Sequence, residues 1–281
     1  MCAEQESRGK IVFDEIGRWS EVKLDILKNY AQAYSKILAK QPNLVHVYID
    51  AFAGPGQSVS RTTRGIVPGS PLIVLDVQPR FAEYYFVEEN PAKAQALREL
   101  AGGRQETIHI YEGDCNDVLI HEVFPRVQWK DLRRGLCLLD PYGLTLDWKV
   151  VETAGRMGTV DLILNFPVMD MNRNVFWRNP EGVDEADLAR MNRFWGDESW
   201  RDVVYDTRGD LFGKPEKQSN EIIAVAFKER LRQVAAFAHV APPIPMRNSK
   251  GAVVYYLFFA SPKPVALKIA SYISDKYRNW T

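Results

Sequence analysis

The stretch VYIDAFAGPG, residues 47–56, joins an apolar run to residues that could contact a ligand. The run ends on Asp50, and the turn after it carries Phe52, Gly54 and Gly56. Glycine tolerates backbone conformations that bring the main chain close to a bound molecule. The glycines therefore either form a tight corner or shape one wall of a ligand site. The turn does not match G-x-G-x-x-G, so a dinucleotide is a less favoured ligand. It does not match a Walker loop either.

Carboxylates follow the next two apolar runs. Glu88 and Glu89 come after YYFV, and Asp114 comes after TIHIYEG. An acid after the second strand of a nucleotide-binding sheet can accept hydrogen bonds from both ribose hydroxyls. An acid after the third strand can accept a hydrogen bond from an exocyclic amino group. Glu88 is favoured as the ribose ligand because it lies nearer the strand end, whereas Glu89 also suits a solvated helix start. Asp114 has a structural alternative, which is to cap a helix at Asn116. The expected nucleoside site comprises Asp50, Phe52, Gly54, Gly56, Glu88 and Asp114.

A further apolar run, LCLL, ends in Asp140-Pro141-Tyr142-Gly143. This stretch resembles the Asp-Pro-Pro-Tyr motif of amine methyltransferases that act on nucleic acids. In that motif the aspartate and a proline carbonyl accept hydrogen bonds from the target amine, and the aromatic ring stacks on a base that has left its duplex. The resemblance implies that Asp140, Pro141 and Tyr142 lie on the acceptor side of the site. The structural alternative is that Asp140 only holds a turn.

The elements that must position these residues follow an alternating pattern. A helix over 19–40, with Ser20 as its N-cap, precedes the first strand at 44–50. Continuous apolar runs separated by helical segments are typical of a parallel sheet covered on both faces. Strands are predicted at 83–90, 107–114, 134–143 and 160–167, and helices at 92–100, 116–124 and 145–157, with another near Pro71 after a capping Ser70. The charged run 126–134 is predicted to be a solvated loop.

The pattern changes after Pro167. Residues 168–218 are rich in Arg, Asn, Asp and Trp and show no clear strand, so a helical cap insertion is predicted. A helix at 220–234, two strands near 235–247 and 251–261, and a helix at 264–277 follow. The organisation expected is an N-terminal tail over 1–18 and one domain over 19–281.

Bulk composition indicates a soluble cytoplasmic protein. The chain has 281 residues and no net charge, with Lys+Arg and Asp+Glu both at 36, so no global field marks a nucleic-acid coat. No apolar run reaches the roughly 18 residues of a membrane span, and the N-terminus does not read as a signal peptide. The three cysteines and four histidines show no metal-ligand spacing.

DAFAGPG resembles the Phe-x-Gly-x-Gly turn of class I S-adenosylmethionine-dependent methyltransferases. FVEEN, EGD and LLDPYG fall where that fold places its next motifs. More narrowly, the chain resembles the three-Cys-motif partner (TcmP) family. The residues that carry this resemblance are WSEVKLDILKNYAQAYSKIL, YIDAFAGPG, GSPL, LLDPYGL, VDLILNFP, FWGDESW and MRNSKGAVVYYLFFAS, from Trp19 to the C-terminal helix.

The resemblance implies an α/β, Rossmann-like methyltransferase fold: a mostly parallel sheet with helices on both faces, C-terminal antiparallel strands and the cap insertion. It implies S-adenosylmethionine as cofactor and a three-Cys-motif protein, encoded nearby, as partner. A nucleobase amine, and so a nucleic-acid substrate, is the acceptor class that DPYG favours. This chain has a single Pro, and Tyr142 comes one position earlier than the aromatic residue of amine methyltransferases. Two alternatives stay open: a catalytically silent partner that docks the three-Cys-motif metalloprotein, and a nuclease or other hydrolase whose Asp50, Asp114 and Asp140 hold a divalent ion.

Overall fold

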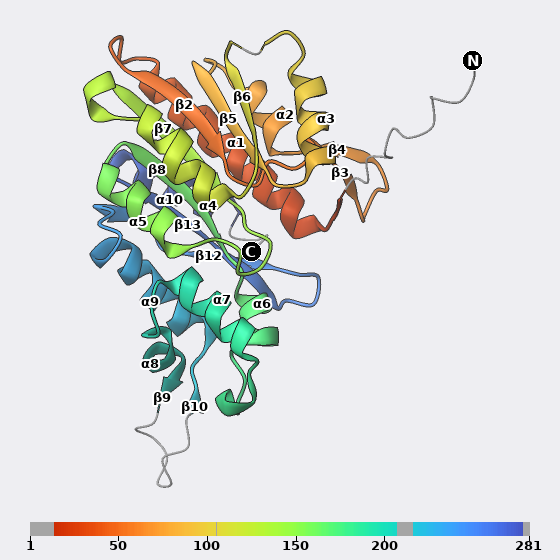
Figure 1. Ribbon diagram of the computed structural model, residues 1–281, viewed down its shortest axis with the longest axis vertical. Coiled ribbons are helices and arrows are strands. Elements are labelled where there is room, and N and C mark those ends of the chain that lie inside the picture. Colours follow the sequence, from red (N-terminus) through yellow and green to blue (C-terminus); the bar gives the residue numbers. More distant parts are fainter. Residues whose placement is uncertain (1–13, 105, 207–215, 278–281) are drawn as a thin grey trace, which may run out of the picture.

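In the computed structural model, the described residues are 14–104, 106–206 and 216–277. Their centre is an eight-stranded sheet in the order β6-β5-β2-β7-β8-β13, with β11 and β12 both paired to the far side of β13 (Figure 1). The strands are β2 (Val45–Asp50), β5 (Glu83–Glu88), β6 (Ile108–Glu112), β7 (Arg133–Leu139), β8 (Val160–Phe166), β11 (His239–Val240), β12 (Ile244–Arg247) and β13 (Val253–Ser261).

Strand directions confirm the predicted fold class. Strands β6, β5, β2, β7 and β8 run parallel to one another. Strand β13 is antiparallel to β8, and β11 and β12 are antiparallel to β13. The protein is therefore an α/β, Rossmann-like chain of the class I methyltransferase type. In this arrangement β13 lies between β8, the fifth parallel strand along the chain, and β12, the strand that precedes β13 in sequence. Five parallel strands place their carboxyl ends at one edge, where ligands bind in such sheets.

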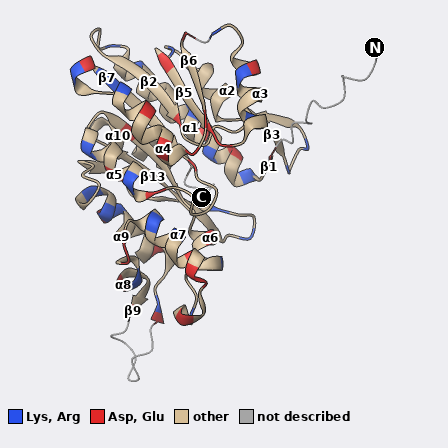
Figure 2. Ribbon diagram, viewed as in Figure 1, with Lys and Arg blue, Asp and Glu red and all other residues tan. Residues whose placement is uncertain are grey.

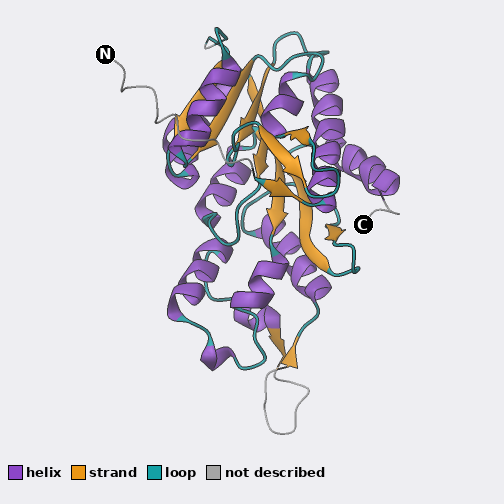
Figure 3. Cartoon of the chain, turned by 90° about the vertical axis from the view of Figure 1, so that its right-hand side faces the viewer, coloured by secondary structure: helices purple, strands orange, loops and turns teal. Residues whose placement is uncertain are grey.

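Helices cover both faces of the sheet (Figure 3). One face packs against α1 (Arg18–Leu38), α2 (Ser70–Leu75), α3 (Pro91–Ala101) and α10 (Val265–Tyr277). The other packs against α5 (Trp148–Met157), α9 (Asn220–Gln233) and a run of α4 (Cys115–Val118), η1 (Leu119–Val123) and η2 (Phe124–Arg126). Because apolar side chains project from both faces, the strands are buried almost throughout.

The insertion extends beyond one end of the sheet in Figures 1 and 3. It contains α6 (Val168–Asn174), η4 (Pro180–Gly182), α7 (Glu185–Trp195), α8 (Trp200–Val204), β9 (Tyr205–Asp206) and β10 (Glu216–Lys217). The expectation of helices in this segment is met. The expectation that it contains no strand was wrong, because β9 and β10 pair antiparallel. Phe194 stacks on Phe227 of α9, so the insertion shares the core of that face.

A small second sheet was missed from the sequence. It consists of β1 (Glu15–Ile16), β3 (Gln57–Ser60) and β4 (Ile66–Pro68). The β1 strand lies in the predicted tail, which therefore belongs to the fold from residue 14 onward; residues 1–13 lie outside the described part. The β3–β4 hairpin follows the glycine turn directly. Such short strands have too few residues to show an alternating pattern.

Three local predictions were wrong. The N-cap of α1 is Gly17 and that of α2 is Gly69, and neither Ser20 nor Ser70 caps with its side chain. Residues 126–134 were expected to be a solvated loop, but they contain the turn η3 (Trp129–Asp131), and Val127 and Arg134 are buried.

No helix in the described part of the chain combines the length and the apolar character that a membrane span needs. Figure 2 shows Lys and Arg interspersed with Asp and Glu along the helices.

Candidate functional site

Two neighbouring cavities lie at the carboxyl edge of the parallel strands. The larger, of about 330 Å³, is formed by the glycine turn after β2, the ends of β7 and β8, α1 and β13. The smaller, of about 110 Å³, is formed by the ends of β2, β5 and β6. Phe52 and Tyr142 line both cavities, so the two spaces adjoin. Together they bring most of the predicted site residues to one place.

The turn 52–56 adopts backbone conformations that favour glycine. Gly54 has φ +64° and Gly56 has φ +84°, both in the left-handed region. A Cβ on Gly56 would also lie 2.8 Å from Leu100 Cδ1. The Gly54 N–H donates a hydrogen bond to Glu88 Oε2 at 2.8 Å. The turn is therefore fixed against β5 and presents its backbone to the larger cavity.

Asp50 lies beneath this turn and lines neither cavity. It is fully buried and accepts a hydrogen bond from the Phe52 N–H at 3.2 Å. Burial raises the pKa of the Asp50 carboxyl to about 6, although hydrogen bonds from Ser70 and from Phe52 oppose the shift. The structure thus places Asp50 as a support of the turn, not at the cavity surface where the sequence-based hypothesis had it.

Glu88 and Asp114 both line the smaller cavity. Glu88 Oε1 also accepts from the Asn90 N–H at 2.8 Å, so each of its oxygens already binds one main-chain amide and keeps a further lone pair. Asp114 Oδ1 accepts from the Asn116 N–H at 2.9 Å and caps α4. Asp114 therefore caps α4 with Oδ1, as the structural alternative predicted, while its Oδ2 has no hydrogen-bond partner among the described residues.

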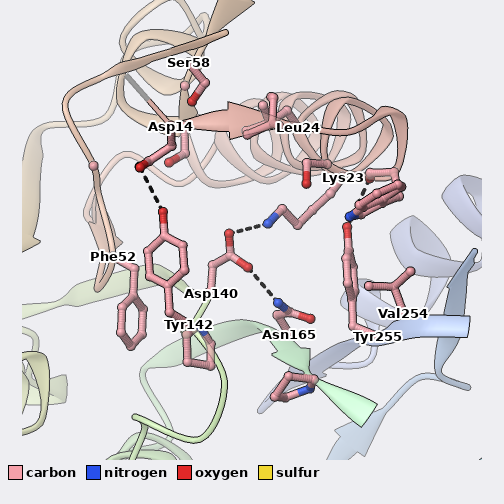
Figure 4. A pocket seen from close by; sticks show the side chains of 18 of the residues that line it. Asp14, Lys23, Leu24, Phe52, Ser58, Asp140, Tyr142, Asn165, Val254 and Tyr255 are labelled. Carbon is pink, nitrogen blue, oxygen red and sulfur yellow. Dashed lines mark hydrogen bonds and ion pairs between the residues drawn. The ribbon is translucent and has the colours of Figure 1, made fainter. Parts of the chain in front are cut away.

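Asp140 lies between two side chains in the larger cavity (Figure 4). Its Oδ2 forms an ion pair with Lys23 of α1, and its Oδ1 accepts a hydrogen bond from Asn165 Nδ2 at 2.8 Å. That bond fixes the orientation of the Asn165 amide. Asn165 is 7% exposed, and its Oδ1 has no partner within the described chain. A buried acceptor without a donor is costly, so Asn165 Oδ1 suits a ligand N–H.

Tyr142 stands at the mouth of the cavities, with 67% of its surface exposed. Its hydroxyl donates to Asp14 Oδ2 at 3.0 Å, and Lys93 forms an ion pair with the same carboxylate at 2.6 Å. The Lys93 Nζ also lies 5.7 Å from the centre of the Tyr142 ring. One face of the ring is thus supported by a cation. Pro141, by contrast, is buried.

Sequence reasoning missed Lys23, Asp14 and Tyr255, which come from segments remote from the strand ends. Tyr255 of β13 lines the larger cavity, lies 5.5 Å from Lys23 Nζ and donates to the Trp19 carbonyl at 3.0 Å. A lysine on an amphipathic helix has no local signature of a buried partner. Among the described residues, no group of three or more His, Cys, Asp or Glu side chains could hold a metal ion.

Neither a protein-family model nor a curated protein sequence matches the chain. Similar solved structures include a Legionella pneumophila protein of the DUF519 family, with 9% identity, TM-score 0.47 and 92% of each chain covered. Another is TYW2 of M. jannaschii in complex with AdoMet, with 10% identity, TM-score 0.38 and coverage of 86% of this chain and 75% of that one. A geranyl diphosphate methyltransferase in complex with SAM has 12% identity, TM-score 0.36 and coverage of 87% and 85%. The fold assignment rests on the strand order and directions of the chain itself.

Proposed function

We propose that this chain is an S-adenosylmethionine-dependent methyltransferase whose acceptor carries an N–H group. The observation that carries the proposal is the pair of adjoining cavities at the carboxyl edge, one acidic and narrow, the other roomier. The residues present fit the cofactor: Glu88 offers lone pairs for ribose hydroxyls, and Asp114 Oδ2 is free for an adenine amino group. Phe52, Gly54 and Gly56 of the glycine turn line the larger cavity, where the methionine part would lie.

S-adenosylmethionine supplies an activated methyl group when it is bound. What this chain must do is hold an acceptor nitrogen in line with that group and exclude competing orientations. Asn165 Oδ1 can accept one N–H of the acceptor. Asp140 fixes the Asn165 amide through its 2.8 Å hydrogen bond, and Lys23 holds Asp140 in turn. In this arrangement Asp140 positions the acceptor through Asn165, which differs from the direct contact that the sequence suggested.

A nucleobase amine is the acceptor class that we favour. The exposed ring of Tyr142 lies at the cavity mouth, where a base that has left its stack can pack against an aromatic face. Pro141 is buried and belongs to the same turn. The single proline of DPYG does not prevent this, because the ring is held in place by Asp14.

The resemblance to the TcmP family carries a second, separate proposal, that the protein acts with a three-Cys-motif protein. A silent docking role and an active methyltransferase differ in what the cavities bind. Cofactor binding is therefore the property to measure first.

The test is calorimetric titration of the protein with S-adenosylmethionine and with S-adenosylhomocysteine. We expect micromolar affinity that Glu88→Ala weakens at least tenfold, since hydrogen bonds to a charged group contribute about 1.5–3 kcal/mol. Glu112→Ala is the matched control, because Glu112 ends the adjacent strand and pairs with Arg98 outside both cavities. If neither ligand binds, or if the two variants weaken binding equally, the methyltransferase proposal fails and a docking role becomes the better explanation.

A further inference from the structure

A separate cavity of about 320 Å³ lies at the opposite edge of the sheet, where β7 and β8 begin. We name it the amino-edge pocket; Tyr34, Leu38, Trp129, Arg134, Asp161 and Ile269 are among the residues that line it. None of the predicted site residues contributes to it. Its volume is in the range of small-molecule sites, which start at about 300 Å³.

The amino-edge pocket contains a buried arginine with no carboxylate partner. Arg134 is 8% exposed, and among the described residues it forms no ion pair. Its guanidinium stacks on Trp129, with Cζ 3.4 Å from the ring centre, and one nitrogen donates to the Arg133 carbonyl at 2.6 Å. Buried arginines are normally paired, and an unpaired buried charge is strongly unfavourable. An anion bound in the pocket would give Arg134 the partner that the described residues do not supply.

The acid in the pocket does not supply that anion. Asp161 Oδ1 accepts from Ser261 Oγ at 2.7 Å, and its Oδ2 accepts from the Tyr30 hydroxyl at 3.2 Å. Burial raises the pKa of the Asp161 carboxyl to about 7, against the effect of these two hydrogen bonds. A largely buried carboxyl of this kind gives up much of its charge near neutral pH, so it neither neutralises Arg134 nor strongly repels a second carboxylate.

Tyr34 adds a hydrogen-bond donor next to the arginine. Its hydroxyl has no hydrogen-bond partner within the described part of the chain, although the residue is 5% exposed. Burial and the Asp161 charge raise the pKa of Tyr34, and the nearby Arg134 charge lowers it. The hydroxyl therefore stays protonated and able to donate. A guanidinium and a hydroxyl are two donors for one anionic head group.

The remaining walls are mostly apolar, with Gln41 as a polar exception. They come from the end of α1, the residue before β2 and the start of α10, and consist of Ile37, Leu38, Leu44, Pro262, Val265 and Ile269. Lys263 also lines the pocket, with its Nζ 5.5 Å from the Trp129 ring. Lys263 could give a multiply charged anion a further donor, but such an anion would also lie close to Asp161 and would leave the apolar walls without a partner. A single negative charge on an apolar body matches the lining better.

We propose that the amino-edge pocket binds a small organic monocarboxylate, with its carboxylate on Arg134 and Tyr34 and its apolar body against α1 and α10. The site is distinct from the methyltransferase cavities, at the other edge of the same strands. Its ligand would act as an effector or a stabilising ligand, since none of the residues assigned to the cofactor or to the methyl acceptor lines this pocket.

The test uses hexanoate and its neutral analogue hexanamide as probes, followed by calorimetry and thermal unfolding. We expect hexanoate to bind at least tenfold more tightly than hexanamide. Arg134→Met should remove this preference, because methionine keeps the apolar bulk but not the charge. Arg126→Met alters an exposed arginine whose one hydrogen bond among the described residues is to the Glu122 carbonyl, so it should leave the preference unchanged.

Leu38→Trp provides an independent variant that keeps Arg134 and fills the apolar part of the pocket, so it should weaken hexanoate binding at least tenfold. This variant keeps the test decisive if Arg134→Met does not fold. The proposal is overturned if hexanoate and hexanamide bind equally, if hexanoate does not bind at millimolar concentration, or if Arg134→Met retains the acid preference. Arg134-dependent binding of inorganic phosphate without binding of hexanoate would also overturn it, since the ligand class would then be wrong.

Discussion

Lys23 and Asp140 lie 117 positions apart in the sequence, yet their side chains form an ion pair on the wall of the larger cavity. Both side chains are mostly buried, at 12% and 24% exposure. The pair joins α1 to the end of β7, and through Asn165 to the end of β8. This wall of the larger cavity is therefore a connected polar unit formed by Lys23, Asp140 and Asn165, not a set of independent residues.

Removing the cation should expose this connection. In Lys23→Met, Asp140 loses its ion-pair partner in a partly buried place, close enough to Asp50 to raise the pKa of that buried carboxyl. We expect the free energy of unfolding at pH 7 to fall by about 2 kcal/mol, between the values for exposed and for fully buried pairs. Urea denaturation of this variant and of Lys23→Met/Asp140→Asn measures the effect. The double variant should recover part of the loss; equal losses in both would contradict a charge-based explanation.

The glycine turn can be tested without changing any charge. In Gly56→Ala, the residue must keep φ near +84° and its Cβ meets Leu100. We expect a loss of about 1–2 kcal/mol in unfolding free energy from the left-handed conformation, together with weaker S-adenosylmethionine binding. Gly103→Ala is the control, because a Cβ there meets no atom within 4 Å. Equal stability of the two variants would show that the turn is less constrained than its geometry indicates.

Tyr142 provides the test of a nucleobase acceptor. Its hydroxyl contacts Asp14 and its ring is exposed, so the two parts can be removed separately. Tyr142→Phe should keep the affinity for a single-stranded oligonucleotide within about twofold, whereas Tyr142→Ala should lose about tenfold, as expected for one stacked base. Fluorescence anisotropy with a labelled oligonucleotide measures both.

Tyr272→Ala is the matched control, since that tyrosine on α10 is 69% exposed and lies outside both cavities at the carboxyl edge. If Tyr272→Ala weakens the oligonucleotide as much as Tyr142→Ala does, the stacking role is wrong.

The buried carboxyl of Asp161 predicts a pH dependence of stability. Its pKa is about 7 in the folded protein and about 3.9 in an unfolded chain. Between these values the native state holds a proton that the unfolded state has released. The unfolding free energy from this group therefore falls as the pH rises from about 4 to about 7, and is constant above that.

Asp161→Asn removes this dependence. The difference in unfolding free energy between variant and wild type should shift in favour of the variant as the pH rises across that range, by up to about 4 kcal/mol. Any fixed cost of the asparagine cancels from this comparison across pH. Urea titrations at pH 4, 5, 6, 7 and 8 measure it, and a difference that does not change with pH would refute the assignment.

The parallel sheet and its functional edge could be predicted because both depend on local signals. Apolar runs such as LCLL mark strands buried on both faces, and the residue after each run must lie at the common edge. That reasoning correctly predicted that Glu88, Asp114 and Asp140 lie at the carboxyl edge of the sheet. It placed Asp50 at the cavity surface, although the carboxylate points under the turn and binds the Phe52 N–H.

What could not be predicted depends on contacts between distant segments. Lys23 looks like any lysine on an amphipathic helix, and only the tertiary fold places it against Asp140. The same holds for Arg134, which lies in a charged run that reads as solvated, yet is buried against Trp129. The Gly17 and Gly69 caps were missed because nearby serines are the commoner choice at that position.

The position of β13 sets a limit on when the fold can form. This strand follows β8, β11 and β12 in the sequence, but it pairs with β8 on one side and with β11 and β12 on the other. During synthesis, the edge of β8 must therefore stay unpaired until residues 253–261 have left the ribosome. Exposed strand edges favour aggregation. A chain that stops before Val253 loses an interior strand, so ribosome stalling or a late stop codon is expected to yield aggregated, not merely shortened, protein.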